Sequence, residues 1–274
     1  MRASLLVLTL LVSACNLFLP QAPAVKAPEP QPAASPDEVE RDPSEPPDVQ
    51  LSTEDDFVVR VVAGNVTCTG ALIAPDRVLT AHHCVAVRSA NGNFEARDME
   101  PERVRIELGG GHFPWGEVSV KSIVAPSCGH GAGDGDIAVL VLERAVHGVK
   151  TRAPELDQAP LEGVEVMPIG FGRCAQSGDG VYRKVRNGSA VTRVAPEHFQ
   201  LQAAICPGDS GGPAVSLSTG RILGVVSRSV MDGDEASLGL TELSRLDAFR
   251  AVFASAALVA EGAGVAELPP VDCR

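Results

Sequence analysis

The stretch Cys206-Pro207-Gly208-Asp209-Ser210-Gly211-Gly212-Pro213 organises the rest of this chain. Its glycines suit a tight turn, because glycine adopts backbone angles that bulkier residues avoid. A serine on such a turn acts as a nucleophile when a nearby base takes its proton. The converging backbone N–H groups would bind a developing negative oxygen. The other interpretation is a plain surface turn, so the question is whether the chain also supplies a base and an acid.

Length and composition exclude some classes of protein. The chain has 274 residues, of which 45% are hydrophobic, enough for one large domain or two small ones. Its 27 glycines and 21 prolines are typical of a fold with many turns. The formal net charge of -12 argues against a nucleic-acid partner, because phosphates require a basic surface.

The amino terminus has the pattern of an export signal. An apolar run from Leu5 to Val12 is too short to span a bilayer but fits a signal peptide over residues 1–14. Small residues before Cys15 are similar to a bacterial lipobox, which predicts that Cys15 is lipidated. Ordinary cleavage after Ala14, leaving a free cysteine, is the alternative. Asn16 is not the aspartate of inner-membrane retention, so we expect an outer-membrane lipoprotein of a bacterial cell envelope, or otherwise a secreted or periplasmic protein.

Residues 15–50 are predicted to form the lipidated cysteine and a linker. From Pro20 to Gln50 the chain is rich in Pro, Ala, Glu and Asp and has no periodic apolar pattern. Such a segment buries too little surface to offset its ordering entropy. We interpret it as a tether to a membrane, with a removable pro-segment as the alternative, and place the folded domain at residues 51–274.

Short strand-like runs separated by Gly and Pro fill most of this domain, and they favour an all-β barrel or sandwich. One helix is predicted at about residues 245–260, where Leu246, Phe249, Val252, Phe253 and Leu258 share a face. The expected strands are Phe57–Ala63, Val66–Ile73, Arg77–Thr80, Val104–Leu108, Glu117–Val124, Ile137–Leu142, Val164–Ile169, Tyr182–Val194, Phe199–Ala203, Pro213–Ser216, Arg221–Ser227 and Leu238–Leu243.

Candidates for the base and the acid lie beside two of these strands. Histidine is the side chain best suited to general-base catalysis near neutral pH. His82 and His83 directly follow a strand, whereas we interpret His112, His130, His147 and His198 as solvated surface residues. Asp136 opens a strongly apolar strand, where an unpaired carboxylate would be unfavourable. Asp134 is an equal candidate on these grounds.

Three segments together resemble the chymotrypsin/trypsin family of serine proteases: Thr80-Ala81-His82-His83-Cys84, Asp136-Ile137-Ala138-Val139-Leu140 and Gly208-Asp209-Ser210-Gly211-Gly212-Pro213. The likeness runs from about Phe57 to Val259. It implies two six-stranded antiparallel β-barrels, about 51–150 and 151–244, followed by the helix. It also implies a serine endopeptidase that forms an acyl-enzyme on protein or peptide substrates, without a cofactor or a metal, and we expect a monomer. The alternative is a non-catalytic binding or adhesion lipoprotein on the same fold.

The resemblance assigns roles to individual residues. His83 matches the catalytic base, Asp136 the carboxylate that orients it, and Ser210 the nucleophile, while His82 stands where relatives usually have alanine. The N–H groups of Gly208 and Ser210 would form the oxyanion hole. The run Leu223–Ser227 resembles the strand that pairs with the substrate backbone, with Ser227 near Asp136, and Gly170-Phe171-Gly172 resembles the Gly-Trp-Gly stretch of the second barrel.

Substrate preference is predicted from the primary pocket. Ala204 matches the pocket floor, where relatives that cleave after Arg or Lys have aspartate. A basic substrate side chain would there be a desolvated charge without a partner. Ser229 stands where many relatives have glycine and would narrow the pocket wall. We therefore expect cleavage after small or medium apolar residues.

Six cysteines besides Cys15 are read as disulfides of an exported protein, since no Cys-x-x-Cys pair favours a metal or redox site. The resemblance implies a Cys68–Cys84 bridge around the histidine loop. In relatives Cys206 would pair with a cysteine after Ser227, and this chain has none there. We therefore predict Cys174–Cys206 and Cys128–Cys273.

The activation motif of the family is missing. In trypsin-like zymogens a cut releases an Ile/Val-Val-Gly-Gly terminus, whose ammonium group pairs with the aspartate before the nucleophile. No such motif precedes Phe57, and the nearest sequence, Arg60–Gly64, is predicted to be a strand. Asp209 therefore needs another partner, or the oxyanion loop is ordered differently.

Overall fold

The computed structural model describes residues 53–111, 113–173, 182–203, 205–229 and 239–273. The predicted signal peptide, Cys15 and the linker lie outside these ranges, as do Cys174 and Ala204. No helix within them is both long enough and apolar enough to cross a bilayer.

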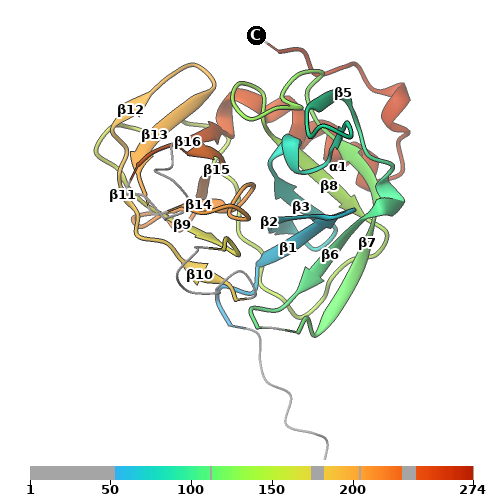
Figure 1. Cartoon of the computed structure of the whole chain (residues 1–274), viewed down its shortest axis with the longest axis horizontal. Helices are drawn as coiled ribbons and strands as arrows, with labels where there is room; N and C mark the ends of the chain where they lie inside the picture. The colour runs from blue at the N-terminus through green and yellow to red at the C-terminus, as the bar shows by residue number, and fades with distance from the viewer. Residues whose placement is uncertain (1–52, 112, 174–181, 204, 230–238, 274) are drawn as a thin grey trace, which may run out of the picture. The chain divides into compact units, whose positions relative to one another are not determined.

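Six antiparallel strands close into a barrel in the first half of the domain, in the order β1-β2-β3-β8-β7-β6 (Figure 1). Valine, isoleucine and leucine dominate these strands, and β-branched residues pack well on a pleated surface. All residues of β1 and β8 are buried. The bounds are β1 Val58–Ala63, β2 Val66–Ala74, β3 Arg77–Thr80, β6 Val104–Leu108, β7 Gly116–Val124 and β8 Ala138–Leu142.

Eight strands form a second antiparallel sheet, whose main path runs β10-β9-β14-β15-β16-β13-β12, with β11 paired to β9. Its own core includes Phe199, Leu201 and Leu243. The bounds are β9 Glu165–Gly170, β10 Lys184–Val185, β11 Ser189–Ala190, β12 Arg193–Val194, β13 His198–Gln202, β14 Pro213–Ser216, β15 Ile222–Ser229 and β16 Leu240–Arg245. The mostly-β, two-part fold with a carboxyl-terminal helix confirms the predicted fold class, but the second part is an eight-stranded sheet and not the predicted six-stranded barrel.

Some predicted boundaries differ from the structure. The single strand expected at 182–194 is three two-residue strands, β10 to β12, of which two pair with β9 and one with β13. A small hairpin of β4 (Ala86–Arg88) and β5 (Phe94–Asp98) was not predicted. The residues of β5 are half-buried or exposed, so they lack the apolar run that signals a strand.

The helix α1 begins at Arg250 and ends at Ala260, after a 3₁₀ turn at Asp247–Phe249. The predicted start at 245 is wrong because Arg245 pairs with Gly224 in the sheet, and this pairing overrides the helical pattern. Val252, Phe253, Ala256 and Val259 form the buried face, whereas Leu258 is exposed. This face packs on β8 and β7 of the barrel.

The two sheets meet where β3 ends, β8 begins and the loop before β14 turns. The Thr69 N–H of β2 donates to the Ser210 carbonyl at 2.8 Å. The Ser244 hydroxyl of β16 donates to the Asp136 carbonyl at 2.8 Å. Each half of the domain thus fixes a segment of the other, and the segments so fixed carry the predicted site.

Candidate active site

His83 lies in a short 3₁₀ turn, His82–Cys84, which follows β3. The turn is tied to β2 by the Cys68–Cys84 disulfide. The ring of His83 is largely buried, and Phe94 of β5 meets it edge-on at a centroid distance of 5.9 Å. The fold therefore restricts both the backbone and the ring of this histidine.

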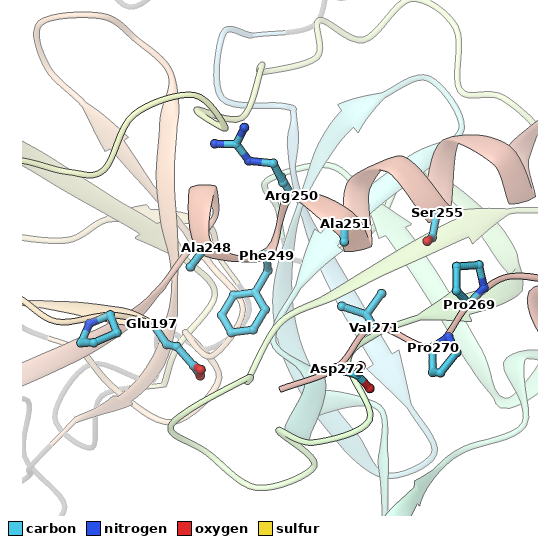
Figure 2. Close-up of a pocket in the computed structure, with 11 residues that line it drawn as sticks. Glu197, Ala248, Phe249, Arg250, Ala251, Ser255, Pro269, Pro270, Val271 and Asp272 are labelled. Carbon is cyan, nitrogen blue, oxygen red and sulfur yellow. The ribbon is translucent and has the colours of Figure 1, made fainter. Parts of the chain in front are cut away.

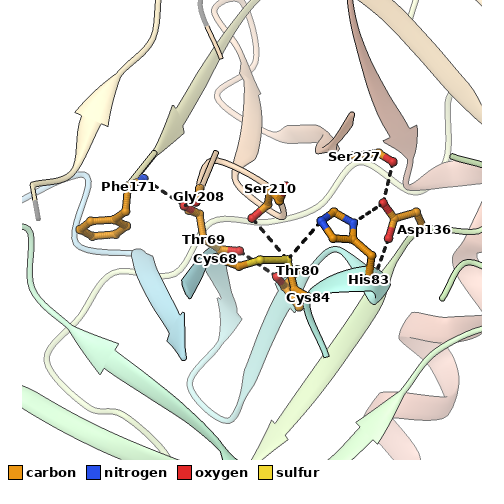
Figure 3. Close-up of a disulfide and its surroundings, with 10 residues drawn as sticks. All are labelled: Cys68, Thr69, Thr80, His83, Cys84, Asp136, Phe171, Gly208, Ser210 and Ser227. Atoms are coloured by element: carbon orange, nitrogen blue, oxygen red, sulfur yellow. Dashed lines mark hydrogen bonds and ion pairs between the residues drawn. A yellow bond between two sulfur atoms is a disulfide. The ribbon is translucent and has the colours of Figure 1, made fainter. Parts of the chain in front are cut away.

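Asp136 is fully buried two residues before β8, and neighbouring groups donate to its carboxylate (Figure 3). His83 Nδ1 lies 2.7 Å from Oδ2, and the His83 backbone N–H donates to Oδ1 at 2.9 Å. The Ser227 hydroxyl donates to Oδ2 at 2.6 Å. Asp134, the other candidate, has a side chain that is 75% exposed and pairs with His198. The structure thus joins Asp136 to His83.

Ser210 lies on a turn that only glycine-rich sequence can form. Gly208 and Gly211 have φ values of 102° and 78°. A Cβ on Gly211 would also lie 2.2 Å from the Thr80 hydroxyl oxygen. A side chain at either position would therefore strain or displace the turn.

Two backbone N–H groups on this turn make no hydrogen bond to any residue that the structure describes. Those of Asp209, Gly211 and Gly212 donate to carbonyls of Cys206, Val226 and Asp209 at 2.7–3.0 Å. Within the described part of the chain, the N–H groups of Gly208 and Ser210 donate to nothing. An oxyanion hole needs such a pair of unused donors.

Asp209 is buried and has a cationic partner, Arg186, which follows β10. The guanidinium Nε lies 3.1 Å from Oδ1 and 3.0 Å from Oδ2. The Gly172 N–H donates to Oδ1 at 2.7 Å and the Cys206 N–H to Oδ2 at 2.9 Å. Burial raises the pKa of Asp209, and Arg186 with the two N–H donors opposes that rise. Arg186 is thus a cationic partner of Asp209 from within the folded domain.

The Gly170-Phe171-Gly172 segment encloses this carboxylate. A Cβ on either glycine would lie 2.3 Å from a carboxylate oxygen of Asp209. Arg186 Nη2 also donates to the Gly172 carbonyl at 2.6 Å. The segment can therefore approach the carboxylate only because both flanking residues lack side chains.

Thr69 of β2 connects the barrel to the turn. Its hydroxyl donates to the Gly208 carbonyl at 2.7 Å and accepts from the Phe171 N–H at 2.9 Å. Thr80 donates to the Thr69 carbonyl at 2.8 Å. These buried and partly buried bonds hold the turn against the strand that also carries Cys68.

The Ser210 hydroxyl and His83 are not hydrogen-bonded to each other in the structure. The Cys84 sulfur lies 3.8 Å from His83 Nε2 and 3.7 Å from the Ser210 carbonyl oxygen. This sulfur belongs to a disulfide and has no hydrogen to donate, so both are contacts only. The ring of His83 lies between Asp136 on one side and this sulfur on the other (Figure 3).

The specificity residues are only partly described. Ser227 and Ser229 lie on β15, and the Ser229 hydroxyl is 3.1 Å from that of Thr241. Ala204 lies outside the described residues. A hollow of about 280 Å³ lined by Glu197, Phe249 and Asp272 contains none of the predicted site residues (Figure 2).

The structure contains the Cys68–Cys84 and Cys128–Cys273 disulfides, both as predicted. Cys206 is disulfide-bonded, but Cys174 lies outside the described residues, so the pairing of these two stays a prediction. The second bridge joins the carboxyl-terminal tail to the loop before Asp136.

Two histidines interpreted as solvated have partners. His198 Nδ1 lies 3.2 Å from Asp134, and His130 Nε2 lies 3.5 Å from Asp98. Burial and the neighbouring His82 lower the pKa of His130, while Asp98 opposes the change. The interpretation failed because these partners come from segments distant in sequence. Arg186, Thr69 and Phe94 were likewise missed, since none of them stands in a motif.

The family model described as Trypsin matches residues 47–244, more than half of the chain. The chain is 28% identical over 213 residues to Cercarial protease of Schistosoma mansoni, covering 66% of this chain and 78% of that protein. It is 32% identical over 179 residues to Peroxisomal leader peptide-processing protease of Mus musculus, covering 64% of this chain but only 28% of that protein.

A solved structure shares the fold. It is a mutant of human heparin binding protein, with a TM-score of 0.60 and 21% identity, and the match covers 76% of this chain and 94% of that one.

Proposed function

We propose that this chain, which belongs to the trypsin family, is a serine endopeptidase that acts through His83, Asp136 and Ser210. One observation carries the proposal: a buried His83–Asp136 pair faces a glycine turn on which two N–H groups have no partner among the described residues. The pair supplies a base, Ser210 a nucleophile and the turn an anion site. These are the parts that acyl transfer requires.

In the proposed first step, the Ser210 oxygen attacks the substrate carbonyl carbon and its proton passes to His83 Nε2. The Nδ1–H of His83 donates to Asp136, which fixes the ring and stabilises the imidazolium. The N–H groups of Gly208 and Ser210 receive the negative oxygen. His83 then returns the proton to the leaving amine as the C–N bond breaks, and the acyl group stays on Ser210. In the second step the same base activates a water molecule, which attacks the acyl group and releases it from Ser210.

The missing Ser210–His83 hydrogen bond is compatible with this mechanism. Catalytic hydrogen bonds are often long in unliganded enzymes and tighten when substrate binds. The serine hydroxyl turns about one side-chain bond, whereas His83 and the turn are held by several contacts. We therefore expect substrate binding to complete the triad by a rotation of Ser210 alone.

Arg186 supplies the charge that orders the oxyanion turn. The ion pair between Arg186 and Asp209 is formed within the domain and uses no chain terminus. We therefore propose that the enzyme is active without proteolytic release of a new amino terminus. In this proposal Arg186 is the partner that Asp209 needs in a chain without the family's activation motif.

The preferred substrate has a small or medium apolar residue before the cleaved bond. Ala204 at the matching floor position offers no carboxylate, and Ser229 lies on the strand next to the proposed pocket. A peptide-substrate library tests this preference. Strong cleavage after Arg or Lys would contradict it.

Lipidation of Cys15 in a bacterial cell envelope, with attachment to the outer membrane, completes the proposal. It is supported by the apolar run and small residues before Cys15. The test is fractionation of the wild-type chain and of Cys15→Ser. The variant should move from the membrane to the soluble fraction, and equal distribution of both chains would contradict the proposal.

A fluorophosphonate probe tests the catalytic assignment. Wild-type protein with its disulfides intact should gain one adduct by mass, and peptide mapping should place it on Ser210. Ser210→Ala should gain none, and Ser218→Ala serves as the matched control that still reacts. An unlabelled wild-type protein, or labelling that survives Ser210→Ala, would contradict the assignment.

The second candidate is a non-catalytic binding or adhesion lipoprotein. Two observations favour it: the Ser210 hydroxyl and His83 are not bonded, and a structure with this fold bears the name of a binding protein. The same probe separates the candidates, because a binding protein with this fold would leave Ser210 unmodified.

A further inference from the structure

We propose that His82, Asp98 and His130 form a binding site for a divalent cation of the zinc type. The three residues come from the turn after β3, the end of β5 and the loop before β8. Their ligand atoms all lie within 4.8 Å of one another. The proposal does not rest on peptidase activity, because none of the three belongs to the proposed triad.

His82 shows why a cation belongs there. Its Nδ1 lies 2.7 Å from the Cys128 carbonyl, which can only accept, so this nitrogen carries a hydrogen. Its Nε2 lies 2.6 Å from Asp98 Oδ1. A neutral ring would therefore direct a lone pair at a carboxylate oxygen. Both atoms can thus ligate one ion beside this contact once the pair opens slightly, because two ligands that each lie about 2.0–2.2 Å from a tetrahedral zinc are further apart than 2.6 Å.

The surroundings match those of a metal-bound histidine. A ligating histidine commonly donates its other ring N–H to a backbone carbonyl, which fixes the tautomer and the ring orientation. His82 is fully buried and has this arrangement with Cys128. The Cys128–Cys273 disulfide restrains the carbonyl that holds the ring.

His130 supplies a third ligand next to the same carboxylate. Its Nε2 lies 3.5 Å from Asp98 Oδ1, and its ring centroid lies 4.3 Å from that of His82. Small side-chain adjustments would place one ring nitrogen of each histidine and a carboxylate oxygen of Asp98 at roughly 2.0–2.2 Å from a shared zinc ion. The side chains of His130 and Asp98 remain partly exposed at 15% and 33%, so a water molecule can reach a fourth position.

The ligand set selects among metals. Two imidazoles and one carboxylate suit zinc and other late first-row metals, whereas calcium and magnesium favour oxygen ligands alone. The neighbouring group of Cys68, His83 and Cys84 is no competitor, because its two sulfurs form a disulfide and are not thiolates. We therefore assign one zinc-type site to the described part of the chain.

Such an ion would join two segments that carry the proposed triad. His82 directly precedes His83, and His130 lies in the loop that leads to Asp136. An ion bound only by the folded chain stabilises it. We infer that the ion clamps the turn after β3 to the loop before β8.

Isothermal titration of the full-length chain with Zn²⁺ tests the site. We expect one ion per chain with a Kd in the micromolar range, and a higher Tm in the presence of Zn²⁺ than in Mg²⁺. Asp98→Asn and His130→Gln should each weaken binding at least tenfold and remove the shift in Tm. His147→Gln, which changes an exposed histidine elsewhere, should bind as the wild type does.

Two results would overturn the proposal. One is the absence of Zn²⁺ binding to folded wild-type protein at millimolar concentration. The other is equal binding by wild type, Asp98→Asn and His130→Gln, which would place the ion elsewhere. Circular dichroism checks that each variant is folded. Asp98→Asn and His130→Gln test the site independently, so the test still holds if one of them fails to fold.

Discussion

Two aspartates lie buried in this site and have different kinds of partners. Asp136 is 0% exposed and accepts from His83 and the Ser227 hydroxyl. Asp209 is 1% exposed and accepts from two backbone N–H groups and from Arg186. A buried carboxylate without partners would be strongly destabilising, so both sets of donors are necessary.

The difference between the partners indicates a difference in role. The partners of Asp136 are neutral while His83 is unprotonated, so the carboxylate can respond when the ring gains a proton. Arg186 carries a permanent charge, so the Asp209 pair has the same charge state throughout a reaction cycle. Asp136 is therefore suited to chemistry, and Asp209 to holding the oxyanion turn in one shape.

Asp136→Asn should have the largest effect on activity. The amide keeps the shape of the carboxylate but presents an N–H₂ group to His83, which favours the wrong ring tautomer. We expect kcat to fall about 10⁴-fold, as for this change in related triads. Steady-state kinetics with a peptide substrate measures it. Asp134→Asn is the matched control and should stay within about twofold, because its side chain is mostly exposed; an equal loss in both would undo the distinction between the two aspartates.

Arg186→Met should have the next largest effect. Removing one partner of a buried ion pair typically destabilises a protein by about 3–5 kcal/mol. Disorder of the oxyanion turn should lower kcat about 10²–10³-fold, which is the range for loss of one hydrogen-bond donor from an oxyanion hole. Urea unfolding and peptide kinetics measure the two effects. The double variant Arg186→Met/Asp209→Asn should recover much of the lost stability, because no unpaired charge remains.

The pH dependence of Arg186→Met follows from Asp209. Burial already raises the pKa of Asp209 and Arg186 opposes the rise, so removing Arg186 raises it further. An acid whose pKa is raised on folding gives stability below its unfolded pKa of about 3.9 and loses it as pH rises through the folded pKa. The unfolding free energy that Arg186→Met loses relative to wild type should thus be smaller at pH 5 than at pH 8. A deficit that does not vary with pH would contradict this.

Thr69→Val tests the connection between barrel and turn. The change removes the hydroxyl that donates to the Gly208 carbonyl and accepts from the Phe171 N–H. Both backbone groups then lose this hydrogen-bond partner. We expect a loss of about 1–3 kcal/mol in unfolding free energy together with a lower kcat. Thr69→Ser should preserve most of the activity because it keeps the hydroxyl. If valine and serine behave alike, the hydroxyl does not order the turn.

The smallest effect is expected at the surface of the second sheet. Burial of Glu242 would raise its pKa, but hydrogen bonds from Arg228 and Gln200 and nearby positive charges lower it overall. This pair therefore adds stability above the unfolded Glu pKa of about 4.3, and the gain is lost as pH falls through the folded value. Arg228→Gln should lower stability at pH 7 by about 0.2–1 kcal/mol, since Arg228 is 54% exposed. Urea unfolding at pH 7 and pH 3 measures it; a loss at pH 3 as large as at pH 7 would contradict the assignment.

How much was predictable from sequence differs between the two aspartates. Asp136 opens an apolar strand, where the pattern left Asp134 an equal candidate, and the resemblance to the serine protease family then assigned Asp136 to His83. Arg186 lies in a stretch expected to be one strand, 182–194, which instead breaks after two residues of β10. That break directs its side chain to Asp209. The cluster of His82, Asp98 and His130 could not be predicted from the sequence either, because only the barrel and the β4–β5 hairpin bring the three residues together.

The most direct test of the account is the peptidase activity of the chain with its amino-terminal region uncut. We expect protein whose intact mass shows no cleavage between Cys15 and Phe57 to hydrolyse a peptide after an apolar residue, and Ser210→Ala to be inactive. Activity that arises only after a cut upstream of Phe57, in step with the new amino terminus, would contradict the claim that Arg186 orders the turn.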